Sequence, residues 1–319
     1  MSSCDRPGRG ERPAARRRDL LAAAGALLLA GCTDGPDAGA GEPSAPAGAP
    51  GSTPAGSTPA GSTPAGSTPV ESPGASSTPS APPPTPGTPQ EVLAHSTVPV
   101  LCYHQLREWR DGDSDATRSL TTPPRAFTAQ MEALRDGGRT PVDAAAVVDH
   151  LELGAPLPER PVLLTFDDGS ATHHSVALPV LERLGFPGAF FPMTVVLGEP
   201  DWLGPDQVRD LDRAGMAVGA HSWDHQRMDR LSGEEWQRQL DEPAAELAEV
   251  LGRPVDLLAY PFGAWSPETL PHVTSAGYRA AFQLDEPSDP TSPLLTIRRI
   301  MPLPTWDAGT LLARLEAES

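Results

Sequence analysis

The chain has 319 residues, with 39 Pro, 30 Gly and only three Cys, and its formal net charge is −18. The chain contains no Lys. This acidic balance argues against a nucleic-acid-binding protein, because phosphate contacts need a basic surface. Pro and Gly gather upstream of about residue 95, so roughly 220 residues remain for one folded domain with a sizeable core.

The first 32 residues have the order of an export signal. Three arginines, Arg16 to Arg18, precede an apolar run over 20–30 that is too short to span a bilayer. The stretch is similar to a twin-arginine signal, and "LAGC" at 29–32 resembles the lipobox of bacterial lipoproteins. We therefore expect a lipid on Cys32 to hold the protein at the extracellular face of the cell membrane. The alternative is a plain secretory signal with a coincidental Cys.

Residues 33–95 read as a disordered linker. They are rich in Pro, Ser, Thr, Gly and Ala, and the pentad "AGSTP" repeats between Ala55 and Pro69. Such a segment has too few apolar residues to form a core, so it stays extended and solvated. In a polyproline conformation it reaches on the order of 150 Å, a length suited to a tether between a membrane and a surface polymer.

Residues 96–319 alternate between strand and helix patterns. Helical spacing occurs around Phe127, Met131 and Leu134, then at 176–184, 208–211, 232–251 and 307–317. Repeated strand–helix units predict an α/β fold with parallel strands inside and helices outside, and seven units favour an irregular (β/α)7-type barrel. The expected strands are 98–103, 161–166, 188–193, 216–221, 257–261, 278–284 and 296–301.

Two of these strands end in polar residues that suit a metal site. "TFDDG" places Asp167 and Asp168 after a buried strand, and "HSWDH" places His221 and His225 after another. Adjacent carboxylates repel, and a cation offsets that repulsion. Two imidazoles with one carboxylate form a ligand set that leaves a position open for water on Zn²⁺. Because catalytic residues in barrels lie at the carboxyl ends of strands, these motifs predict a shared site there.

"TFDDG" followed by "HSWDH" resembles the polysaccharide deacetylases, carbohydrate esterase family 4, and the resemblance extends over residues 97–305. It implies that Asp167 is the catalytic base. It also implies that Asp168, His221 and His225 hold Zn²⁺, or another divalent ion such as Co²⁺ or Ni²⁺. The activity implied is hydrolysis of an acetyl group on a polysaccharide.

Two further motifs refine the resemblance. "YPFG" at 260–263 matches the family's third motif, which implies that the backbone N–H of Tyr260 helps to bind the oxyanion. "PVLCYH" at 99–104 resembles the start of the poly-β-1,6-N-acetylglucosamine deacetylase subgroup, which implies that His104 is the general acid. The usual late catalytic His and the Arg before the third motif are missing. Arg298 or Arg299 is expected to replace that Arg beside the base.

The function expected from these residues is a monomeric, lipid-anchored hydrolase that removes N-acetyl groups from a surface or cell-wall polymer, with poly-β-1,6-N-acetylglucosamine of biofilms as the leading substrate. Alternatives are an N-deacetylase for peptidoglycan or chitin, an O-acetyl-xylan esterase, and a carbohydrate-binding lipoprotein with weak turnover. Among the remaining residues, His173 and His174 are expected to be solvated, and Cys102 is expected to be a core thiol.

Overall fold

A computed structural model of the chain describes residues 85–318. The predicted export signal, the lipobox Cys32 and most of the predicted linker lie outside these residues. Within the described part of the chain, no helix combines the length and apolar character needed to cross a membrane.

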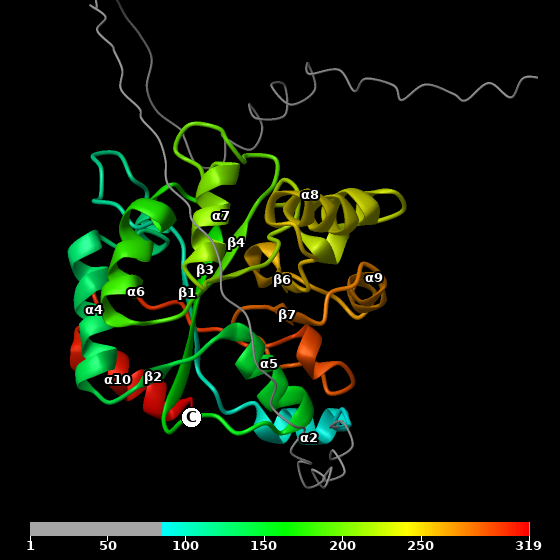
Figure 1. Cartoon of the computed structure of the whole chain (residues 1–319), viewed down its shortest axis with the longest axis horizontal. Coiled ribbons are helices and arrows are strands. Elements are labelled where there is room, and N and C mark those ends of the chain that lie inside the picture. Colours follow the sequence, from blue (N-terminus) through cyan, green and yellow to red (C-terminus); the bar gives the residue numbers. More distant parts are fainter. Residues whose placement is uncertain (1–84, 319) are drawn as a thin grey trace, which may run out of the picture. The chain divides into compact units, whose positions relative to one another are not determined.

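Parallel strands form the centre of the domain (Figure 1). β1 pairs with β3, β3 with β4 and β4 with β5, while β6 and β7 pair separately; β2 lies beside the start of β3. Apolar and β-branched residues dominate these strands, as is usual where both faces of a parallel sheet are covered. The strands are β1 (Val100–Tyr103), β2 (Thr140–Pro141), β3 (Pro161–Asp168), β4 (Ala189–Pro192), β5 (Ala217–Val218), β6 (Leu257–Ala259) and β7 (Ala280–Phe282).

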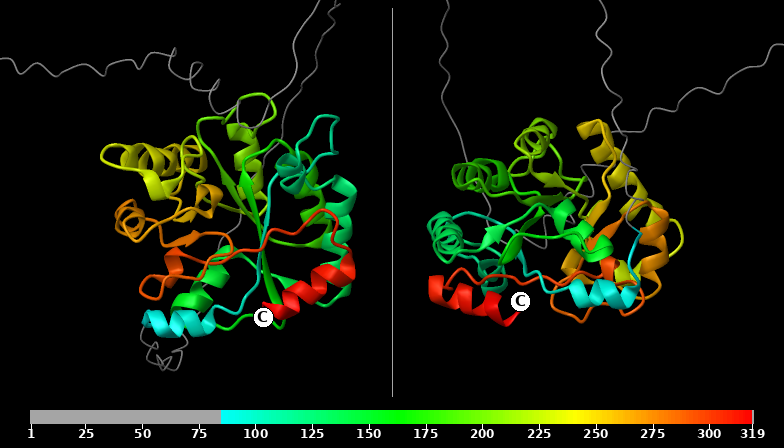
Figure 2. Two further views of the ribbon diagram at one scale, coloured as in Figure 1. Left: turned by 180° about the vertical axis from the view of Figure 1, so that it is seen from behind. Right: turned by 60° about the horizontal axis from the view of Figure 1, so that its bottom comes forward.

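Single bridges close these strands into a ring. Ala220 pairs with Leu258 between the β5 and β6 segments, Phe282 pairs with Ile297, and Ile300 pairs with Leu101 of β1. The seventh position of the ring is therefore filled by residues 297–300, the closing segment, which runs between β7 and β1 (Figure 2). The predicted α/β barrel is thus confirmed, although the strand expected at 296–301 makes only isolated bridges.

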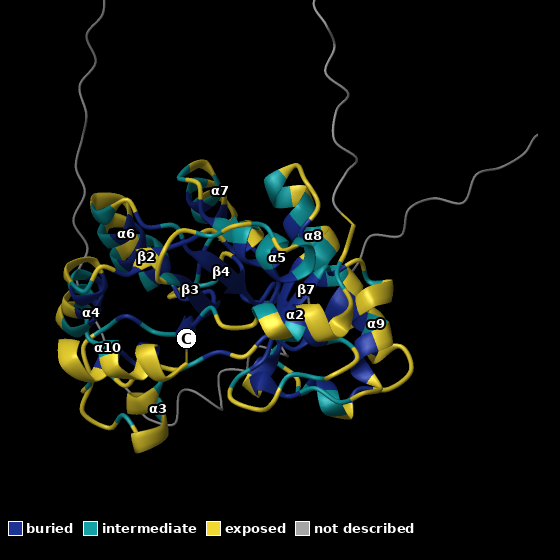
Figure 3. Cartoon of the chain, turned by 90° about the horizontal axis from the view of Figure 1, so that it is seen from below, coloured by how far each residue is buried: buried dark blue, intermediate teal, exposed yellow. Residues whose placement is uncertain are grey.

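Helices surround the ring, and their exposed faces point to solvent while the strands are buried (Figure 3). Several begin at residues that satisfy free N–H groups: Asp143 accepts from Ala145, and Asp307 accepts from Thr310. The helix expected at 232–251 starts at Glu235 and passes through a π-helical turn at Gln237–Asp241. The α-helices are α2 (Pro89–His95), α3 (Asp115–Ser119), α4 (Pro124–Asp136), α5 (Ala144–Leu153), α6 (Leu178–Leu184), α7 (Pro205–Arg213), α8 (Glu242–Leu251), α9 (Thr269–Ser275) and α10 (Ala308–Ala317).

Helix α2 lies on the linker side of the boundary predicted at residue 95. Thr88 and Glu91 form a capping box, and Pro89 occupies the first turn, where its missing N–H costs nothing. Val92 is buried among apolar residues of α5 that include Val147 and Leu151. Val92 is the one buried residue of α2. Composition alone does not distinguish such a short helix from the Pro-rich sequence before it.

Candidate active site

The barrel brings the predicted site residues together at the carboxyl ends of its strands. Asp167 and Asp168 are the last residues of β3, and His104 follows β1. His221 and His225 follow β5. These segments lie close together because β1, β3, β4 and β5 are successive neighbours in the sheet.

Asp168, His221 and His225 have the spacing of a metal site. Asp168 Oδ1 lies 3.3 Å from His221 Nε2 and 3.4 Å from His225 Nε2. Bonds of about 2.0–2.1 Å at a tetrahedral angle place ligand atoms roughly 3.3–3.4 Å apart, so the three atoms fit one Zn²⁺-sized ion. Asp168 Oδ1 and His221 Nε2 are buried and have no hydrogen-bond partner. Buried polar atoms normally find partners, which supports a cation between them.

Backbone contacts orient the histidine ligands. His221 Nδ1 lies 2.8 Å from the carbonyl oxygen of Ala259, which can only accept, so this nitrogen carries the proton. The Nε2 lone pair of His221 is therefore free to face Asp168. Burial lowers the pKa of His225 to about 4 and keeps its ring neutral, as a metal ligand must be. Burial raises the pKa of Asp168, but its contacts with the histidines outweigh that effect and hold it below its ordinary value.

The backbone is strained around this cluster. Asp168, Ser222, His225 and Phe262 all have positive φ angles, of 75°, 61°, 66° and 60°. Non-glycine residues rarely adopt this region, and each instance costs on the order of 1–3 kcal/mol. Strained residues cluster where the surrounding fold holds functional groups in place, so the concentration at this end of the barrel is independent support for a functional site.

Asp167 is held by Arg299, which comes from the closing segment. Arg299 Nη1 and Nη2 donate to the two carboxylate oxygens at 2.7 Å each, and Arg299 Nε donates to the carbonyl of Gln283 at 2.9 Å. Burial raises the pKa of Asp167, but the charge of Arg299 outweighs it and lowers the value to about 2. Arg298 instead lies at the surface, 3.3 Å from Glu318. Of the two arginines considered from the sequence, Arg299 is therefore the one that contacts Asp167.

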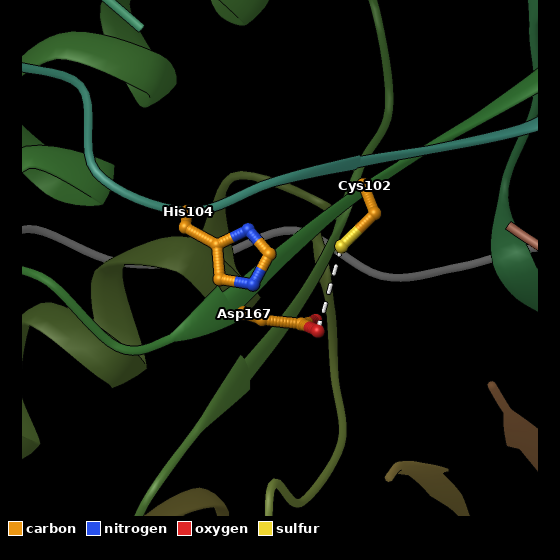
Figure 4. A group of neighbouring side chains, drawn as sticks. All are labelled: Cys102, His104 and Asp167. Atoms are coloured by element: carbon orange, nitrogen blue, oxygen red, sulfur yellow. Dashed lines mark hydrogen bonds between the residues drawn. The ribbon is translucent and has the colours of Figure 1, made fainter. Parts of the chain in front are cut away.

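His104 and Cys102 also lie close to Asp167 (Figure 4). One ligand atom each of Cys102, His104 and Asp167 lies within 4.8 Å of the others. The thiol of Cys102 donates to Asp167 Oδ2 at 3.5 Å, and burial raises the pKa of that thiol well above its ordinary value. Cys102 is buried, as expected of a core thiol, whereas His104 is half-buried.

The expectation that His173 is solvated is wrong. Its ring contacts the rings of both Phe166 and Phe190 and is fully buried, and that burial lowers its pKa to about 4. His173 Nε2 lies 2.6 Å from the backbone carbonyl of His104 and donates to it. This contact ties the end of β1 to the turn after β3. His174, by contrast, is half-exposed and lies 3.1 Å from Asp210.

The oxyanion role predicted for Tyr260 does not fit the structure. Its backbone N–H donates to the carbonyl of Phe282 at 2.9 Å as part of the barrel, and its hydroxyl donates to Leu295. The Phe262 ring contacts a residue of the metal cluster, since its centroid is 4.4 Å from that of His225. Among residues 85–318 no acceptor contacts the Phe262 N–H. The sequence shows the "YPFG" motif. It does not show which backbone N–H of this motif is free of hydrogen bonds between the barrel strands.

Residues 154–281 match the family model described as polysaccharide deacetylase. YxkH of Bacillus subtilis (strain 168) is 25% identical over 185 residues, which cover 57% of this chain and 62% of YxkH. The poly-beta-1,6-N-acetyl-D-glucosamine N-deacetylase of Escherichia coli (strain K12) is 31% identical over 87 residues, covering 27% of this chain and 13% of that enzyme. The chain thus spans less than two thirds of both curated relatives.

A solved structure shares the fold. The Streptococcus pyogenes deacetylase PplD, in complex with acetate, superposes with a TM-score of 0.63 at 23% identity, covering 68% of this chain and 97% of that one. At this identity the likeness establishes the fold alone. Residues 154–281 are therefore similar to the polysaccharide deacetylase family, and the domain shares the fold of a solved deacetylase.

Proposed function

We propose that this chain is a metal-dependent hydrolase that removes acetyl groups from the amide nitrogens of a polysaccharide. The observation that carries the proposal is the Asp168, His221 and His225 cluster beside a buried, Arg-paired Asp167 at the mouth of the barrel. Metal ligands and an ionised carboxylate in adjacent positions suit the attack of water on an acyl carbon.

Both the attack on the acyl carbon and the departure of the nitrogen need catalysis, because an acetamide is a poor electrophile and an amine anion is a poor leaving group. Asp168, His221 and His225 would hold a divalent ion, which would supply Lewis-acid activation of water and of the acyl oxygen. The Phe262 N–H is the donor available for the developing negative charge on that oxygen. It takes the role that the sequence had assigned to the N–H of Tyr260.

Asp167 and His104 share the proton transfers. The two hydrogen bonds from Arg299 fix the Asp167 carboxylate and keep it ionised, so it accepts a proton from the attacking water. His104 lies within reach of Asp167 and half-exposed at the mouth, where a leaving nitrogen would arrive. It donates the proton that converts this nitrogen into a neutral amine.

Poly-β-1,6-N-acetylglucosamine is the substrate we propose. Two observations support it: the name and partial match of the Escherichia coli relative, and the position of His104 at the start of the domain. We further propose that the protein is a monomer and that a lipid on Cys32 holds it at the outer face of the cell membrane. The long Pro-rich segment would then let the domain reach its polymer.

The experiment is an assay of free acetate with purified protein on a panel of poly-β-1,6-N-acetylglucosamine, peptidoglycan, chitin oligomers and acetylated xylan, with and without Zn²⁺. We expect zinc-dependent release, fastest on poly-β-1,6-N-acetylglucosamine. Asp168→Asn should abolish it, whereas the control Asp206→Asn, on the exposed surface of α7, should not. No acetate from any polymer would leave only a binding role, and release from xylan esters alone would make the protein an esterase.

A further inference from the structure

We propose that Cys102, His104 and Asp167 form a second metal site, selective for thiophilic ions, and that filling it blocks the reaction. The three side chains supply one sulfur, one nitrogen and one oxygen ligand, all within 4.8 Å of one another (Figure 4). None of them belongs to the Asp168 cluster. Only the blocking effect rests on the proposed function; the binding of metal does not.

The distance between sulfur and oxygen already suits a metal ion. Cys102 Sγ and Asp167 Oδ2 are 3.5 Å apart. A tetrahedral Zn²⁺ with bonds of about 2.3 Å to sulfur and about 2.1 Å to oxygen holds these two atoms roughly 3.6 Å apart. An ion could therefore replace the thiol proton with little movement of either side chain.

His104 provides the third ligand and the route of entry. Cys102 and Asp167 are both 2% exposed, so an ion cannot approach them from the far side. The His104 ring is half-buried and lies beside the sulfur and the carboxylate (Figure 4). An ion that enters from the mouth meets this imidazole first and the two buried ligands next.

Arg299 determines the order in which the two sites fill. It donates to both oxygens of Asp167 at 2.7 Å, and although carboxylate oxygens can accept a further bond, its positive charge opposes a nearby cation. Cys102 must also lose a proton, whereas Asp168 Oδ1 and His221 Nε2 already lack partners. The second site therefore fills only after the first, and it favours ions with high affinity for thiolate.

The chemistry of binding is a simple exchange. The Cys102 S–H bond breaks, a sulfur–metal bond forms, and the proton leaves to solvent, so no oxidant or reductant is needed. The bound ion occupies the lone pairs of Asp167 and His104, the proposed base and acid. Excess Zn²⁺ or Cd²⁺ should thus inhibit the same protein that its first equivalent of metal activates.

Cd²⁺ titration tests the binding without any substrate. The full chain carrying Cys4→Ser and Cys32→Ser, so that Cys102 is the sole thiol, is freed of metal and titrated while its ultraviolet absorbance is followed. We expect a second equivalent of Cd²⁺ to bind with thiolate-to-metal charge-transfer absorption, and Cys102→Ser to lose both the second equivalent and the absorption. Circular dichroism and a second variant, Cys102→Ala, check that the loss does not come from unfolding.

Zinc dependence of acetate release then tests the blocking effect. In the parent chain the rate should rise up to the first equivalent of Zn²⁺ and fall with further Zn²⁺. In Cys102→Ser the rate, expressed relative to that variant's own maximum, should not fall with further Zn²⁺. Two results would overturn the proposal. One is that Cd²⁺ gives no charge-transfer absorption in the parent chain, and the other is that excess Zn²⁺ still inhibits the folded Cys102 variants. If acetate release is not detected while the absorption appears as expected, the proposed function fails and the second site stands.

Discussion

The ion pair between Asp167 and Arg299 permits a quantitative test of how the site is built. Both side chains are 2% exposed or less, so solvent screens their attraction very little. Removing one partner of a buried pair costs about 3–5 kcal/mol, because the other charge stays buried and unpaired. We expect Arg299→Met to lower the free energy of unfolding by this amount at neutral pH. Arg298→Met, which breaks a surface pair, should cost about 0–1 kcal/mol.

The pH dependence of the effect follows from the pKa of Asp167. Arg299 holds it at about 2, below its unfolded value, so in the parent protein the pair stabilises the fold above the unfolded pKa and loses that effect as pH falls toward about 2. Without Arg299, burial raises the pKa of Asp167 above its ordinary range. The cost of Arg299→Met should therefore be largest at neutral pH and should shrink as acid protonates Asp167.

Urea unfolding, followed by circular dichroism with a chelator present, measures these free energies without interference from bound metal. The double variant Asp167→Asn with Arg299→Met removes both charges and should recover much of the stability lost in Arg299→Met. Two results would refute the reasoning: equal costs for Arg299→Met and Arg298→Met, or a double variant no more stable than Arg299→Met alone.

Further predictions separate the roles of the remaining residues. Asp168→Asn should lose both bound metal and activity, whereas Asp167→Asn should keep most of its metal and lose turnover. Elemental analysis of the purified variants measures the bound metal. Equal metal content in both variants would contradict the roles assigned to the two carboxylates. His104→Ala should still bind metal but lose about two to four orders of magnitude in rate on the amide polymer, and less on an activated aryl acetate that needs no proton donor. An equal loss on both substrates with a lowered melting temperature would make His104 structural. Cys32→Ala should move the protein from the membrane fraction to the medium, and continued membrane retention would contradict a lipid anchor.

Local sequence patterns predicted the barrel well because its strands are buried on both faces. Apolar runs such as "PVLLTF" mark β3, and the polar residues that follow it and β5 mark the mouth of the barrel. Two adjacent carboxylates and a His-x-x-x-His spacing each indicate metal ligands within a stretch of a few residues. The Asp168, His221 and His225 grouping was therefore accessible before the fold was known.

Contacts between distant segments were less predictable. Asp167 and Arg299 are 132 residues apart, and only closure of the ring decides that Arg299, not Arg298, faces inward. The burial of His173 follows from its contacts with Phe166 of β3 and Phe190 of β4, which its polar neighbours in the sequence do not indicate. The N–H of Tyr260 is unavailable because β7 lies beside it, so its assignment needed the pairing of β6 with β7.

The most direct test of the central claim is to measure bound zinc and acetate release on the same samples of protein. Metal-free chain is loaded with increasing Zn²⁺ up to one equivalent, and each sample is analysed for zinc and assayed on poly-β-1,6-N-acetylglucosamine. The site described above predicts that acetate release rises in proportion to zinc bound and that Asp168→Asn shows neither. A chain that binds its full equivalent through Asp168 and releases no acetate from this polymer, or that releases acetate equally well without metal, would contradict it.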